Sequence, residues 1–421
     1  MKGIYKKNFL KKYLLNADYL QQVLLSIAFI ICLVFCSSVA VSATSATEEN
    51  SSSNTQTETT DTVNDTNPST SSDTETAANA TNSDTSSGTE TDNAKSDTST
   101  DTKTTSKTSK KNKTVKITIS AAGDCTLGVD SRYNNTFNDY YNKNGDAYFF
   151  KKVKSLFSKD DLTIVNFEGT LTTSTARANK TFTFKAPAKY VKILKKGSVE
   201  VVNLANNHTM DFGSQGFKDT KNTLKKNKIS YCEGNTIAYK TVKGVKIAFV
   251  GFNALNGVTE QQVKNTIQTA KKKKAKIIIA SFHWGIEKEY YPNTRQKTLG
   301  RCAISSGASL VLGHHPHRVQ GVEKYKGRYI VYSLGNFSFG GHTNPDDKDA
   351  LIFQQTFYVK NGKLQKKNDA KIVPCSISSV SYTNNYQPKI LTGSEKKRLI
   401  KKMNTLSKGM NTSFENSGKV K

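Results

Sequence analysis

Acidic residues, cysteine and histidine are all scarce in this chain of 421 residues. The chain has 34 Asp and Glu against 62 Lys and Arg, and only six cysteines and six histidines. The cysteines follow neither the paired spacing of a zinc ribbon nor the density of a disulfide framework. We interpret the four after residue 43 as small buried hydrophobic residues. A disulfide in an exported chain is the alternative, and the spacing does not select a pair.

Residues 44–110 lack aromatic residues altogether and contain a single valine. Ser, Thr, Asp, Asn, Glu, Gln, Gly and Ala make up most of this stretch. Such a composition offers too little apolar surface to offset the entropy of an ordered chain. We therefore expect residues 44–112 to be a disordered linker. Residues 113–385 are long enough to form a folded domain with a sizeable core, and residues 386–421 read as a basic C-terminal tail.

An apolar run at residues 23–41 follows five lysines near the N-terminus. Its 19 residues are enough to span a bilayer, and the basic flank favours a cytoplasmic N-terminus. We predict a single-pass cell-membrane protein with a cytoplasmic segment at 1–22, an anchor at 23–43 and an extracellular domain. The alternative is a cleaved signal peptide and a secreted protein, because residues 38–40 and 41–43 both resemble cleavage sites.

Positive charge is concentrated in the domain that we expect to fold. Residues 1–43 carry +4 and residues 44–110 carry −8, so the formal net charge of +28 leaves +32 on residues 111–421. Such a surface attracts polyanions, and we expect polyglutamate or a cell-wall polyanion as partner. A general lysine bias is the competing explanation. A secreted nuclease would fit the charge, but the chain lacks the clustered Arg and stacking aromatic residues of nucleic-acid binders.

Strand-like apolar runs alternate with segments of helical spacing. The expected strands are 113–122, 162–167, 199–204, 246–252, 276–282, 309–312, 328–333 and 351–359. The expected helices are 147–157, 187–196, 216–227, 259–274 and 295–305. This alternation predicts an α/β fold. The late strands without intervening helices indicate a second or mixed sheet.

Five of the six histidines fall in three short motifs that directly follow expected strands. These motifs are Asn203–His208, Phe282–Gly285 and Gly313–His317. Ligands gather at the carboxyl ends of strands in open α/β sheets, and histidine is the commonest metal-ligating side chain. The clustering therefore predicts a metal site.

Carboxylates occur at similar positions. Asp124 and Glu168 each follow a strand, although either alone would be typical of a turn, a helix cap or a solvated loop. Asp211 could orient His208 or cap the next helix. One histidine beside a tryptophan, His283, would by itself suggest a core residue, so the prediction depends on the motifs taken together.

Two-metal hydrolysis requires this inventory of side chains. Two ions about 3.5–4 Å apart stabilise the attacking and leaving oxygens and lower the pKa of a bound water. The candidate ligands are Asp124, Glu168, Asn207, His283, His315 and His317. We expect one or two divalent ions (Mn, Zn, Fe or Mg). His208 and Asp211 are the candidate catalytic residues, with His208 as a general acid or oxyanion contact.

The motifs in this order resemble the CapA family, which is associated with poly-gamma-glutamate capsule synthesis and is similar to calcineurin-like metallophosphoesterases. The residues that carry the resemblance are Ala122–Asp124, Asn166–Gly169, Asn203–His208, His283–Gly285, Gly313–His317 and Ser333–Phe337. The resemblance implies a metallophosphatase-like layered sandwich of two mixed β-sheets flanked by helices. It also implies an anchored extracytoplasmic protein that works with membrane synthase or export subunits on an anionic polymer.

Two positions depart from the phosphoesterase pattern. That pattern has histidine where this chain has Thr126, and a bridging aspartate where this chain has Glu168. The first metal could therefore be weakly held. One hypothesis is a metal-dependent hydrolase of a phosphoester or γ-glutamyl amide in capsule biosynthesis. The other is a non-catalytic, polyanion-binding assembly subunit of a membrane polymer synthase.

Overall fold

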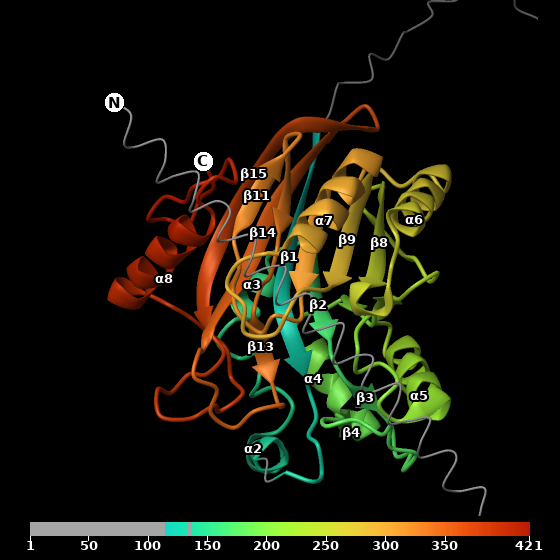
Figure 1. Cartoon of the computed structure of the whole chain (residues 1–421), viewed down its shortest axis with the longest axis vertical. Helices are drawn as coiled ribbons and strands as arrows, with labels where there is room; N and C mark the ends of the chain where they lie inside the picture. The colour runs from blue at the N-terminus through green and yellow to red at the C-terminus, as the bar shows by residue number, and fades with distance from the viewer. Residues whose placement is uncertain (1–113, 134–135) are drawn as a thin grey trace, which may run out of the picture. The chain divides into compact units, whose positions relative to one another are not determined.

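Two mixed β-sheets form the centre of the computed structural model, which describes residues 114–133 and 136–421 (Figure 1). The first sheet has the order β16 (Lys389–Ile390), β15 (Lys363–Ser376), β14 (Asp349–Lys360), β1 (Thr114–Thr126), β2 (Leu162–Phe167), β5 (Val201–Asn203) and β6 (Ser230–Cys232), with β13 (Asn336–Phe339) also paired to β1. The second has the order β11 (Val322–Tyr325), β12 (Arg328–Val331), β10 (Leu310–His314), β9 (Ile277–His283), β8 (Val245–Asn253) and β7 (Ala238–Val242). A short pair, β3 (Thr170–Leu171) and β4 (Lys185–Ala186), lies apart from both sheets.

Each sheet combines adjacent parallel strands with antiparallel ones: the antiparallel strands lie at one side of the first sheet and at both edges of the second. In the first sheet β1, β2, β5 and β6 are parallel, whereas β14, β15 and β16 continue it in antiparallel fashion. In the second sheet β8, β9, β10 and β12 are parallel, and β7 and β11 add antiparallel edges. Parallel strands end at the same edge of a sheet, so their carboxyl ends bring loops from distant parts of the chain together.

Alternating apolar residues allow each sheet to bury both faces. On β8, Ile247 and Phe249 join a cluster that contains residues of both sheets, whereas Ala248 and Val250 join a cluster formed with helices. Burying a side chain of this size stabilises the fold by about 1.5–3 kcal/mol. The alternation therefore explains why one core lies between the sheets and a further core lies outside each of them.

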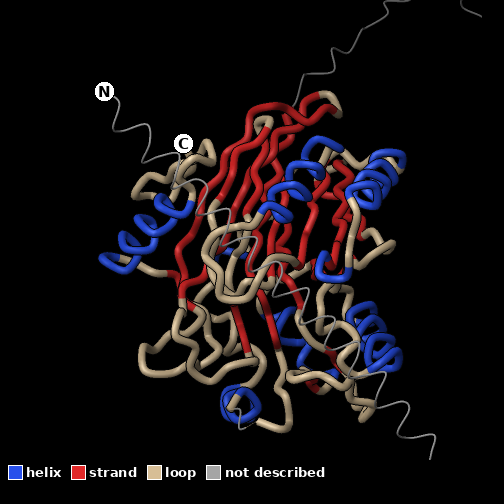
Figure 2. Tube along the Cα trace, viewed as in Figure 1, coloured by secondary structure: helices blue, strands red, loops and turns tan. Residues whose placement is uncertain are grey.

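Most of the helices cover the outer faces of the sheets, whereas the last one packs against the core between them (Figure 2). They are α2 (Phe137–Asn144), α3 (Lys154–Phe157), α4 (Val191–Lys196), α5 (Gly213–Lys226), α6 (Glu260–Lys272), α7 (Thr294–Ser306) and α8 (Gly393–Leu406), with 3-10 turns η1 (Ala188–Tyr190) and η2 (Ala254–Asn256). α6 and α7 pack on the second sheet, whereas α2 to α5 pack on the first. Capping boxes begin α6 and α7, because Thr259 and Asn293 each exchange hydrogen bonds with the glutamine three residues on.

The predicted class, α/β with mixed sheets flanked by helices, is confirmed. The cytoplasmic segment 1–22, the anchor or signal peptide 23–43 and the linker 44–112 lie outside the described residues. Across 114–133 and 136–421, no helix combines the length and apolarity that crossing a bilayer requires.

Two sequence-based assignments differ from the structure. The helix expected at 147–157 is helical only over Lys154–Phe157, and turns precede it. The segment expected to be a basic tail contains β16 and α8, and Leu399 and Met403 of α8 are fully buried in the core that includes both sheets. Lysines surround this apolar stripe in the sequence: Lys397 and Lys401 are exposed, whereas Lys402 forms ion pairs with Asp347 and Asp349.

Candidate metal centre

Loops at the carboxyl ends of parallel strands from both sheets meet at one site. Asp124 lies near the end of β1 and Glu168 directly follows β2. His283 ends β9, and the loop after β10 carries His315 and His317. The ligand atoms of three groups each lie within 4.8 Å of one another: Glu168, His283 and His315; Asp124, Glu168 and His317; and Glu287, His315 and His317.

Local backbone geometry aims Asp124 into the site. The pairing of β1 with β2 and with β13 shifts register beside this residue, and such irregularities re-aim side chains. Gly123 permits the shift, because a Cβ at this position would lie 1.9 Å from the carbonyl oxygen of Gly335. The amide of Asp124 donates to that same oxygen at 3.0 Å.

Asp124 is buried and surrounded by donors. The Asn166 amide donates to its Oδ1 at 2.9 Å, and the backbone amide of His315 donates to Oδ2 at 3.2 Å. His314 Nδ1 lies 3.3 Å from Oδ1 and His317 Nδ1 lies 3.4 Å from Oδ2. Burial alone would raise the pKa of Asp124, but the two imidazoles hold it well below its usual value.

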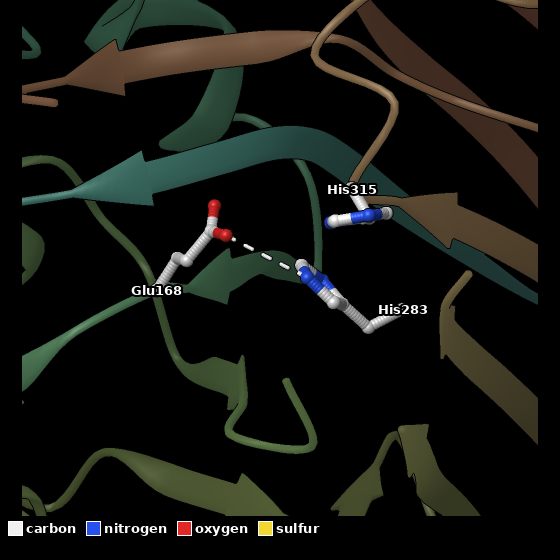
Figure 3. A group of neighbouring side chains, drawn as sticks. All are labelled: Glu168, His283 and His315. Carbon is white, nitrogen blue, oxygen red and sulfur yellow. Dashed lines mark ion pairs between the residues drawn. The ribbon is translucent and has the colours of Figure 1, made fainter. Parts of the chain in front are cut away.

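Glu168 is buried without donors. Neither of its carboxylate oxygens has a hydrogen-bond partner within the described part of the chain. Its Oε1 lies 3.6 Å from His283 Nε2 and 3.8 Å from His208 Nε2. Figure 3 shows this carboxylate facing His283, with His315 beside His283. Burial and the charge of Asp124 raise the pKa of Glu168 to about 8.

The loop after β10 has a strained backbone. His315 and His317 have φ values of 94° and 55°, which residues other than glycine rarely adopt. Each such residue costs of order 1–3 kcal/mol, and residues of this kind cluster at functional sites. Burial lowers the pKa of His315 to about 4, whereas the charges of Glu168 and Asp124 outweigh burial and raise the pKa of His317 to about 10.

Asn207 and His283 complete the set of predicted ligands. The Oδ1 atom of Asn207 lies 2.8 Å from Nε2 of His283. Burial, reinforced by the charge of His315, holds the pKa of His283 well below its usual value. The structure therefore brings all six candidate ligands together. Thr126, where the phosphoesterase pattern has histidine, offers only a buried hydroxyl that makes no hydrogen bond within residues 114–133 and 136–421.

His208 and Asp211 form a pair at the edge of the site. His208 Nδ1 lies 2.7 Å from Asp211 Oδ2, which also accepts from the backbone amide of Phe184 at 2.6 Å. Lys180 Nζ donates to Asp211 Oδ1 at 2.8 Å and lies 3.3 Å from His208 Nδ1. Burial lowers the pKa of His208, and Asp211 opposes that shift. Asp211 thus orients the imidazole with Nε2 toward Glu168.

Three asparagines and Lys180 support the site but were not among the predicted site residues. Asn166 donates to Asp124 and accepts from Asn203 at 2.9 Å through its Oδ1. Asn336 Oδ1 accepts at 2.8 Å from His317 Nδ1. All three asparagines lie in motifs of the sequence, yet a neutral amide gives no signal of such a role without the fold.

A cavity of about 350 Å³ adjoins these residues. His208, His317, Asn336 and Glu287 line it, together with the aromatic rings of Phe182, Phe184 and Phe339. His208 and His317 therefore line the same space.

Comparison with known proteins identifies relatives of the chain. The model of the bacterial capsule synthesis protein PGA_cap matches residues 118–341. The PGA biosynthesis protein CapA of Bacillus subtilis is 34% identical over 270 residues, which are 58% of this chain and 69% of that protein. The capsule biosynthesis protein CapA of Bacillus anthracis is 29% identical over 272 residues, 58% of this chain and 64% of that protein.

Among solved structures, a hypothetical protein from Thermus thermophilus matches with a TM-score of 0.38 and 12% identity, over 61% of this chain and 99% of that chain. This TM-score is too low to establish a shared fold. The family match covers the strand ends that carry Asp124, Glu168, His283 and the histidines after β10. The chain belongs to the bacterial capsule synthesis protein PGA_cap family.

Proposed function

We propose that this protein acts in the biosynthesis or export of poly-γ-glutamate or a similar anionic polymer and that it does so with a metal-dependent hydrolytic site. Its relatives are named for capsule and PGA biosynthesis. The observation that carries the metal-dependent part is the carboxylate of Glu168, which is buried without a hydrogen-bond donor among the described residues and faces His283. A buried carboxylate without donors is costly unless a cation balances it.

The donor set fits one or two divalent cations. Asp124, Glu168, Asn207, His283, His315 and His317 would hold them. Mixed imidazole, carboxylate and amide donors suit Mn, Fe or Zn, while Mg would favour the oxygen ligands. Nδ1 of His315 is also buried and has no hydrogen-bond partner in the described chain, so it is free to coordinate.

The chain's own residues orient a substrate and move a proton. A bound divalent cation in such a site polarises a phosphoryl or carbonyl oxygen and activates water. Asp211 accepts from Nδ1 of His208, which fixes the imidazole with Nε2 toward Glu168, and His208 also lines the cavity. With Nδ1 protonated, Nε2 of His208 has a lone pair, so it can take a proton from an attacking water and pass it to a leaving group while Asp211 stabilises the imidazolium. The substrate would be a phosphoester or a γ-glutamyl amide.

The proposed setting is the outer face of the cell membrane. The apolar run at 23–41 would anchor the chain beside membrane synthase or export subunits, and cleavage there would instead release a secreted protein. The charge of +32 on residues 111–421 would attract an anionic polymer to the folded domain.

Turnover with and without cation tests this function. The purified chain, stripped with a chelator, is assayed with p-nitrophenyl phosphate and γ-glutamyl-p-nitroanilide before and after addition of Mn²⁺. We expect Mn²⁺-dependent turnover that falls at least about 100-fold, together with metal content, in Asp124→Ala and His315→Ala. Asp211→Asn should retain metal and lose about tenfold in turnover. Metal content and activity equal to wild type in both alanine variants would refute the proposal.

A second candidate is a non-catalytic subunit that binds the polyanion beside a membrane synthase. Thr126 favours it, because this hydroxyl replaces an imidazole donor of the phosphoesterase pattern. Under this alternative, salt-sensitive binding of polyglutamate would survive His315→Ala, and no variant would alter turnover. Binding that disappears with His315 would argue against it.

A further inference from the structure

Glu287 lies at the mouth of the metal centre although no role has been assigned to it. Its carboxylate and one nitrogen each of His315 and His317 lie within 4.8 Å of one another. Glu287 is exposed, whereas His315 is buried, so this third group of donors reaches from the centre to the surface. Two imidazoles and one carboxylate form a donor set that binds divalent transition metals and leaves coordination positions open.

The backbone holds Glu287 against the two histidines. The amide of Lys288, the next residue, donates to the carbonyl oxygen of Pro316 at 2.8 Å, and Pro316 separates His315 from His317. Gly285 turns the chain with a φ of 85°, which brings the residues after β9 back over the loop after β10. The side chain of Gln320 fixes the far end of this turn by donating to the carbonyl oxygen of Glu289 at 2.9 Å.

The same position faces the space where a substrate would lie. Glu287 and His317 line the cavity of about 350 Å³ that His208 also lines. No ion-pair partner for Glu287 occurs within the described chain. Its carboxylate is therefore available to a cation that comes from solvent.

We propose that Glu287, His315 and His317 form an outer cation position through which divalent ions enter and leave the centre. The outer group shares His315 with the group of Glu168 and His283, and it shares His317 with the group of Asp124 and Glu168. An ion in the outer position therefore competes with ions in these two inner groups for the same imidazoles. The outer ion would therefore be the weakest bound and the first to exchange. This inference rests on the proposed metal centre and adds a ligand to it.

Zn²⁺ binding by the full chain tests the outer position separately from catalysis. Chelator-stripped wild type, Glu287→Gln and Glu289→Gln are titrated with Zn²⁺ under equilibrium dialysis, and the release of bound Zn²⁺ to a chromophoric chelator is followed in time. Glu289 is the matched control, because it is exposed on the same turn and belongs to none of the three donor groups. We expect Glu287→Gln to lower the affinity for the weakest-bound Zn²⁺ by at least about tenfold and to change the rate at which Zn²⁺ is released. Glu289→Gln should match wild type in both measurements.

Three results would overturn the proposal. Binding isotherms and release rates of Glu287→Gln that match wild type would refute the outer position but not the proposed inner centre. An equal change in Glu289→Gln would mean that only the charge of the turn matters. A wild-type chain that binds no Zn²⁺ would refute the metal centre itself, and the outer position with it.

Discussion

The two buried carboxylates of the site differ in what surrounds them. Asp124 receives hydrogen bonds from the Asn166 side chain and the His315 amide, and two imidazoles lie against it. Glu168 has no donor among the described residues, and the Nε2 atoms of His283 and His208 lie 3.6 and 3.8 Å from its Oε1. Their pKa values accordingly move in opposite directions, well down for Asp124 and up to about 8 for Glu168.

The protein itself supplies hydrogen-bond donors to the carboxylate of Asp124, whereas it supplies none to the carboxylate of Glu168 among the described residues. Glu168 therefore needs a ligand to balance its charge. Without a cation, protons on Glu168 and on His317, whose pKa is raised to about 10, offset the negative charge of the cluster. A divalent cation would displace these protons, as it does wherever ligands must be deprotonated. Asp124 is therefore ionised and held in place whether or not a cation is bound, so it can serve as a ligand, whereas Glu168 is protonated at neutral pH unless a cation binds.

Among substitutions of the two carboxylates, we expect Asp124→Asn to have the largest effect on stability. Removing one partner of a buried, hydrogen-bonded ion pair costs about 3–5 kcal/mol, so we expect this loss in the free energy of unfolding of chelator-treated protein at pH 7. Glu168→Gln is the matched control, because glutamine resembles the protonated acid. It should be no less stable than wild type at this pH. Equal destabilisation by the two substitutions, measured by urea denaturation, would remove the distinction.

A second effect, smaller per pH unit, is the pH dependence of stability that Glu168 contributes. Its pKa rises from 4.5 in the unfolded chain to about 8 in the folded one, so the folded chain without cation holds more protons between these pH values. The free energy of unfolding then falls as pH rises through this window, by at most about 1.4 kcal/mol per pH unit. Glutamine does not titrate, so the stability of Glu168→Gln relative to wild type should increase from pH 5 to pH 8.

Denaturation series at several pH values measure this difference. Glu289→Gln, which changes an exposed carboxylate, serves as the control. A difference between Glu168→Gln and wild type that stays constant from pH 5 to pH 8 would show that Glu168 remains ionised in the folded protein.

Strands and their ends could be predicted from the sequence. Apolar runs mark the strands, and residues of metal-ligating types directly after those runs mark their ends. Strand β2 begins and ends where the apolar run does, and the polar residue directly after it is Glu168. The helix at 393–406 was missed for the opposite reason. Its apolar stripe is short and lies among lysines, and only packing against the sheets reveals that Leu399 and Met403 are core residues.

The candidate ligands could be predicted because imidazoles and carboxylates after parallel strands converge by topology. Residues that hold those ligands in place could not, since their roles depend on side chains far away in the chain. Asn166 contacts a carboxylate 42 positions earlier, and Lys180 reaches Asp211 across 31 positions. Glu287 was visible in the sequence, but only the bond between Lys288 and Pro316 places it beside the histidines.

Anomalous scattering from crystals soaked in Mn²⁺ tests the central claim most directly. If the strand-end loops converge on a divalent cation, a peak should lie within about 2.0–2.6 Å of donor atoms of Glu168, His283 and His315. The same soak of Glu168→Ala crystals should show that peak weakened or lost. No peak between these side chains in wild-type crystals, with Mn²⁺ bound elsewhere or nowhere, would contradict the account.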